Sequence, residues 1–180
     1  MIAYLHDERI FDAGKTFGRH QGWNRQGWGY PVAHVTVSRN TSVAQAVNRV
    51  MLAARTRGSI WLLVLNSHGD AGWMQLGTGL DVSQTCHFAA LQPFMSAGAR
   101  GIEVHSCGSA SARNLGGATG CTGSEGYGKG VTFLHGLARA VQAPARGAIH
   151  CQAEDPRGRF EGPWVLVQPN GAVQTGVGPV

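Results

Sequence analysis

The segment that most constrains the fold is residues 60–65, where six apolar residues follow one another as Ile-Trp-Leu-Leu-Val-Leu. A strand with one face in water would alternate apolar and polar residues, whereas this segment is apolar on both faces. Continuous apolar strands of this kind are typical of parallel sheets, whose strands are joined by crossover helices. Residues 60–65 therefore predict a central strand of an α/β fold.

A helix with one apolar face is predicted just before this strand. Its apolar residues recur at three- and four-residue intervals, which places them in one stripe. Thr41 or Ser42 is expected to cap the start, and Arg55, Arg57 and Gly58 suit the end. The stripe consists of Val43, Ala46, Val47, Val50, Met51 and Ala54.

The other segments complete an alternating order of strands and helices. This order predicts a single α/β domain over residues 1–180, with a mostly parallel central sheet flanked by helices. We expect further strands at 2–5, 32–37, 102–106 and 145–151, a hairpin at 73–80, helices around 88–95 and 131–141, and a C-terminal β-hairpin of 164–167 and 172–175.

Composition excludes several functional classes. The formal net charge is +5, but the arginines are scattered and no run of basic residues marks a nucleic-acid surface. No apolar stretch approaches the roughly 18 residues of a membrane span, and the first residues do not resemble a signal peptide. The four cysteines show no CxxC spacing, which favours reduced thiols. We therefore expect a cytoplasmic protein without a membrane or nucleic-acid partner.

Two predicted central strands end in residues that can carry chemistry. His68-Gly69 follows the strand at 60–65, and Cys107-Gly108 follows the strand at 102–106. Ligands of open α/β sheets bind at the carboxyl ends of the strands, which is where these residues lie. A histidine can activate a neighbouring cysteine as a nucleophile, and a glycine in a tight turn can expose an N–H group to an oxyanion.

The residues around these strand ends resemble the caspase-like (clan CD) cysteine peptidases. The resemblance is closest to bacterial caspase-like domains and covers residues 60–152, including the later Gly130-Val-Thr-Phe-Leu and 143–148 segments. It rests on the order of three motifs: Ser67-His68-Gly69-Asp70-Ala71-Gly72, then Leu76-Gly77, then Glu103-Val-His-Ser-Cys107-Gly108-Ser109-Ala110.

The resemblance implies a catalytic dyad of His68 and Cys107, with Gly69, and by position Gly108, offering backbone N–H groups. Its substrate would be a peptide or protein, and no cofactor is expected. His68 precedes Cys107 by 39 residues, whereas the caspase signature has about 50 and a Gln-Ala-Cys-Arg-Gly sequence. Cleavage after aspartate is therefore not carried over, and oligomeric state is not indicated.

Several further residues are candidates for supporting roles. Asp70 can orient His68, meet substrate or cap a loop. Glu103 and His105 share a strand face with Cys107, where they can tune the thiol or form a buried pair with each other. Nine of the 27 glycines fall in residues 101–130, which predicts mobile loops around the dyad. Weaker candidates for a substrate loop are Arg113, Tyr127 and Lys129.

Other functions remain open at this stage. A non-catalytic caspase-like module that binds a protein is one alternative. Cys107 and Arg113 also fit the Cys-x5-Arg loop of phosphatases, although Ser106 replaces the usual histidine. The segment 123–130 resembles a phosphate-binding loop but ends in Gly130 instead of serine or threonine. No pair of histidines or cysteines has the spacing of a zinc site, so no metal is expected.

Overall fold

The computed structural model describes residues 1–11, 29–111, 129–150 and 162–177. Within these ranges the chain forms a seven-stranded sheet in the order β10-β9-β8-β7-β3-β1-β2. Its strands are β1 (Ile2–Asp7), β2 (Val32–Val37), β3 (Leu62–Asn66), β7 (Gly101–His105), β8 (Ala145–Ala148), β9 (Pro163–Val167) and β10 (Val173–Val177).

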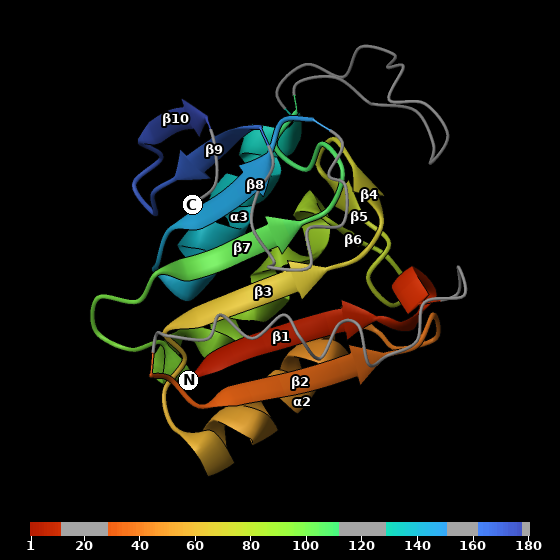
Figure 1. Cartoon of the computed structure of the whole chain (residues 1–180), viewed down its shortest axis with the longest axis vertical. Coiled ribbons are helices and arrows are strands. Elements are labelled where there is room, and N and C mark those ends of the chain that lie inside the picture. Colours follow the sequence, from red (N-terminus) through yellow and green to blue (C-terminus); the bar gives the residue numbers. More distant parts are fainter. Residues whose placement is uncertain (12–28, 112–128, 151–161, 178–180) are drawn as a thin grey trace.

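Five of these strands run parallel to one another. β2, β1, β3, β7 and β8 are parallel, whereas β9 and β10 add an antiparallel hairpin at one edge. The arrowheads of β1, β3 and β7 consequently point to one edge of the sheet (Figure 1). The prediction of a mostly parallel sheet with a C-terminal hairpin is confirmed.

The helices form one layer behind the sheet in Figure 1. α2 (Val43–Arg57) and α3 (Lys129–Val141) pack on either side of η2 (Val82–Phe94), a long 3₁₀ helix, and a short 3₁₀ helix, η1 (Glu8–Phe11), follows β1. The core between this layer and the sheet joins residues from all three long helices and from strands across the sheet.

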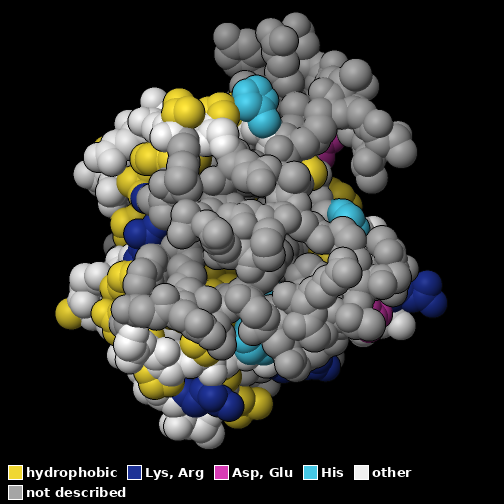
Figure 2. All heavy atoms as spheres, viewed as in Figure 1, with side chains coloured by type: hydrophobic (Ala, Val, Ile, Leu, Met, Phe, Trp, Pro, Cys, Tyr) yellow, Lys and Arg dark blue, Asp and Glu magenta, His cyan; other side chains and the backbone are white. Residues whose placement is uncertain are grey.

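The second face of the sheet, which carries the side chains of Ile2, Tyr4, Leu62 and Val64, has its own apolar cluster. The described residues place no helix on it, so the predicted helices lie on one face only. Nothing long and apolar enough to cross a membrane occurs among the described helices. The Lys and Arg side chains coloured in Figure 2 are spread around the outline of this side of the molecule.

The local predictions differ from the structure mainly at 88–95. The structure shows a 3₁₀ helix that begins at Val82, because the buried side chains Thr85, Phe88 and Leu91 recur every three residues. The central strand begins at Leu62, and Ile60 instead forms an isolated bridge with Met95.

A small antiparallel sheet lies beyond the carboxyl ends of β3 and β7 (Figure 1). It consists of β4 (Gly69–Asp70), β5 (Trp73–Met74) and β6 (Leu80–Asp81). The hairpin predicted at 73–80 is the β5–β6 part of this sheet. Because β4 follows His68 directly, this small sheet sets the backbone of the predicted site.

Candidate active site

His68 and Cys107 follow two neighbouring strands that end at the same level. β3 and β7 pair in parallel, and the last pair in register is Asn66 with His105. Each candidate residue comes two positions after that pair. The two residues are therefore brought to one edge of the sheet, as their order in the sequence predicts.

The two loops stay in contact after the strands end. The N–H of Ser67 donates to the carbonyl oxygen of His105 at 3.4 Å, and the N–H of Gly72 donates to Ser109 at 3.4 Å. Between these bonds Gly69 packs directly on Ser106: a Cβ on Gly69 would lie 2.8 Å from the Ser106 Oγ. Contacts on both sides thus hold the His68 and Cys107 loops side by side.

The accessibility of the two side chains differs. His68 is exposed, whereas Cys107 is half-buried and is not in a disulfide. Cys86 is the other described cysteine, and it is exposed on η2. Solvent therefore reaches both side chains.

The N–H of Gly69 points out of the small sheet. Hydrogen-bonded and non-hydrogen-bonded pairs alternate along an antiparallel ladder. The N–H of Gln75 donates to the His68 carbonyl at 2.7 Å, so His68 and Gln75 form a bonded pair. Gly69, which pairs with Met74, is consequently at a non-bonded position, with its N–H directed away from β5. This N–H can bind an oxyanion.

The amides that follow Cys107 have different partners. The N–H of Gly108 donates to the His150 carbonyl at 2.9 Å, and that of Ala110 donates to Ala148 at 2.8 Å. The N–H of Ser111 donates to the Gly108 carbonyl at 2.7 Å. The N–H of Gly108 is therefore already used in a hydrogen bond to the backbone near β8. A phosphate-binding loop would need these amides directed at an anion.

Glu103 and His105 form the buried pair that alternation along the strand predicts. Oε2 of Glu103 lies 3.2 Å from Nε2 of His105, and Glu103 is 1% exposed. Arg100 donates to the other carboxylate oxygen at 2.7 Å, and Arg146 contacts it at 3.5 Å. Two arginines thus compensate a buried carboxylate beneath the site. A role of this pair in tuning the thiol stays a prediction.

The other candidates are distributed as follows. Asp70 caps its turn, since its Oδ1 accepts the Ala71 N–H at 2.7 Å. Lys129 is exposed at the start of α3, and its backbone lies against Gly72. Arg113, Tyr127 and most of the Gly-rich stretch lie outside the described residues. Within the described ranges no three His, Cys, Asp or Glu side chains cluster as a metal site requires.

Two groups of polar side chains near this edge were not predicted from the sequence. Buried Asp7 forms an ion pair with partly exposed Arg9 at the end of β1. His6, Asn66 and His34 form a hydrogen-bonded row on the second face, with His6 stacked on Tyr4. In the sequence, these two groups are marked only by the polar residues His6 and Asp7 at the end of an apolar strand. Many ordinary strands end in the same way.

Comparisons of the chain with models of known protein families, with curated proteins and with solved structures find no match.

Proposed function

We propose that the chain is a caspase-like cysteine peptidase that uses Cys107 as nucleophile and His68 as general acid and base. The observation that carries the proposal is the contact of the two strand-end loops, with Gly69 against Ser106. This contact places a histidine and a cysteine in adjacent loops at the edge where α/β sheets bind ligands.

The proposed reaction has two steps. The Cys107 thiolate attacks the carbonyl carbon of a peptide bond, and the Gly69 N–H stabilises the oxyanion that forms. The imidazolium of His68 then gives its proton to the leaving amine as the carbon–nitrogen bond breaks. Water, deprotonated by His68, hydrolyses the thioester, which releases the acid and restores the thiol. Because the Gly108 N–H already donates to His150, the proposal assigns the oxyanion to Gly69.

The backbone after Cys107 favours this reaction over phosphate-ester hydrolysis. The amides of Gly108, Ala110 and Ser111 donate to carbonyl oxygens of the chain itself. A Cys-x5-Arg phosphatase would direct such amides at the phosphate instead. The peptidase needs one outward N–H, and Gly69 offers it.

The test is digestion of a peptide library by the wild type, Cys107→Ala and His68→Ala. Matched controls are Cys86→Ala and His87→Ala, which remove an exposed cysteine and an exposed histidine of η2. Cleavage by the wild type and both controls, lost in both site variants, supports the proposal. Cleavage that survives in both site variants overturns it. Absence of cleavage by the wild type, with Cys107 alkylated no faster than Cys86, also overturns it and favours the binding module.

A further inference from the structure

The carboxylate of Asp7 ends β1 in a fully buried position and is bound from several directions. Asp7 is 0% exposed. Nε and Nη2 of Arg9 donate to its two oxygens at 2.7 and 2.8 Å, which is a bidentate pair. The Arg9 N–H adds a bond at 3.0 Å, and the Gly77 N–H adds one at 2.6 Å. A buried charge is stable only when it is paired and hydrogen-bonded in this way.

Arg9 extends the same pair to the loop that follows β5. Its Nη2 also lies 2.6 Å from the carbonyl oxygens of both Gln75 and Gly77, so its two N–H groups are shared between these carbonyls and the Asp7 carboxylate. The Gly77 N–H donates to Asp7 in addition. The ion pair therefore binds residues 75–77 through three polar contacts. A second anchor comes from Thr41, whose carbonyl oxygen accepts the Thr78 N–H at 2.9 Å.

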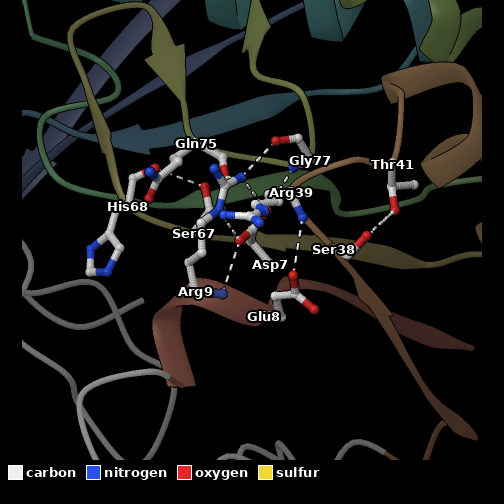
Figure 3. A network of polar contacts seen from close by, with 10 residues as sticks. All are labelled: Asp7, Glu8, Arg9, Ser38, Arg39, Thr41, Ser67, His68, Gln75 and Gly77. Carbon is white, nitrogen blue, oxygen red and sulfur yellow. Dashed lines mark hydrogen bonds and ion pairs between the residues drawn. The ribbon is translucent and has the colours of Figure 1, made fainter.

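Gln75 connects the Asp7–Arg9 ion pair to the backbone of His68. While its carbonyl accepts from Arg9, its N–H donates to the His68 carbonyl at 2.7 Å. The hydroxyl of Ser67 donates to the same His68 carbonyl at 2.9 Å. In Figure 3 the His68 backbone faces Gln75, while its imidazole points away from the ion pair. The ion pair therefore fixes the backbone from which the imidazole extends.

We propose that Asp7 and Arg9 are positioning residues that hold His68 in register with Cys107. The inference rests on the proposed peptidase function, because register matters only if the two side chains react together. A shift of about 1 Å in a catalytic group can lower the rate about 100-fold. Asp7 and Arg9 precede His68 by 61 and 59 residues in the sequence. Within the described part of the chain, hydrogen bonds link them to the His68 backbone through Gln75.

The variants follow from the geometry. Arg9→Gln removes the charge that pairs with buried Asp7, so stability is expected to fall, and folding is checked first by circular dichroism. Arg9→Lys keeps the charge without the planar fork and should give an intermediate effect. The matched control is Glu8→Gln, since Glu8 is an exposed neighbour whose carboxylate accepts the Arg39 N–H at 3.2 Å.

Two measurements report on the inference without a substrate. Hydrogen exchange should become about 10- to 100-fold faster at Gln75 and Gly77 in Arg9→Gln, with β1 and β3 unchanged. Alkylation of Cys107 by iodoacetamide, followed against pH, should move from the wild-type profile toward that of His68→Ala. With a cleaved peptide in hand, kcat should fall about 100-fold while KM stays within about twofold. Glu8→Gln should match the wild type in every measurement.

The outcomes separate this inference from the proposed function. If the wild type and His68→Ala have the same alkylation profile, the dyad is wrong and the inference falls with it. If those two differ but Arg9→Gln keeps the wild-type profile, only the positioning role is overturned. Unchanged exchange at Gln75 and Gly77 in Arg9→Gln overturns it as well.

Discussion

At the scale of single residues, Gly69 has no room for a side chain where the two loops meet. A Cβ there would lie 2.7 Å from the Trp73 carbonyl oxygen and 2.8 and 2.9 Å from Oγ and Cβ of Ser106. Gly69→Ala should therefore push the two loops apart and lower kcat/KM about 100-fold. Steady-state kinetics on a cleaved peptide measure this. Adding Ser106→Gly removes two of the three close atoms and should restore part of the activity; wild-type activity in Gly69→Ala would contradict the role.

The lowered pKa of His34 predicts that the free energy of unfolding decreases in acid. Partial removal of its ring from water and the nearby charge of Arg57 lower the pKa of His34 below its usual 6.5. The hydrogen bonds agree with this direction. The Asn66 amide donates to Nδ1 of His6, so Nε2 of His6 donates to Nδ1 of His34 at 3.1 Å, and a protonated His34 could not accept it.

The sign of the effect follows from the lowered pKa. Between the folded pKa and about 6.5 the unfolded chain binds more protons, so stability falls as the pH drops. Urea unfolding at pH 7.5 and 5.5 should show a larger loss for the wild type than for His34→Gln. Equal losses in the two proteins would show that His34 does not contribute.

At the scale of elements, α2 begins with a complete capping box. Oγ of Ser42 accepts the Gln45 N–H at 3.2 Å, and Oε1 of Gln45 accepts the Ser42 N–H at 2.9 Å. Ser42→Ala should lower the free energy of unfolding by about 1 kcal/mol. For a chain of this size that corresponds to a Tm decrease of roughly 2–4 °C, measured by thermal unfolding. Ser59→Ala, at an exposed serine beyond the helix end, is the control and should leave Tm unchanged.

The elements also show which sequence patterns were sufficient to predict secondary structure. The stripe of Val43, Ala46 and Val50 and the Ser42 cap are local, and they predicted α2 closely. The helix predicted around 88–95 is present as η2, but its start at Val82 and its 3₁₀ type were not predicted. Phe88 and Leu91 are three residues apart, which suits an α-helix and a 3₁₀ helix equally. Only the third buried position, Thr85, distinguishes the two, and a threonine is a weak hydrophobic signal.

At the scale of the whole molecule, topology made part of the site predictable. His68 and Cys107 each follow an apolar strand, and parallel strands bring their carboxyl ends to one edge. The Asp7–Arg9 pair was not predictable, because its partners Gln75 and Gly77 are reached through a hairpin whose position no local pattern encodes. Long-range polar contacts of this kind depend on the finished fold.

The continuity of the core predicts that the described elements unfold as one unit. Leu134 of α3 and Leu5 of β1 belong to the same buried cluster, although β1 lies between β3 and β2 while α3 contacts β7, β8 and β9. Leu134→Ala should lower the free energy of unfolding by about 2–5 kcal/mol, because it leaves a cavity where the side chain was 0% exposed. Leu52→Ala is the matched control: Leu52 is 51% exposed on α2, and its loss should change stability by less than about 0.5 kcal/mol.

Native-state hydrogen exchange shows whether this loss is shared. If the core is one cooperative unit, the slowest amides of β1 and β8 should lose protection by the same free energy in Leu134→Ala. Chains above about 150 residues often depart from two-state unfolding, so this result is not guaranteed by size. Slow amides of β1 that keep their protection would instead divide the sheet somewhere between β1 and β8. Exchange at β3 and β7, the strands that His68 and Cys107 follow, would locate the boundary. A boundary between β3 and β7 would place the two residues of the proposed dyad in independently unfolding parts, whereas a shared loss means that one cooperative core supports both.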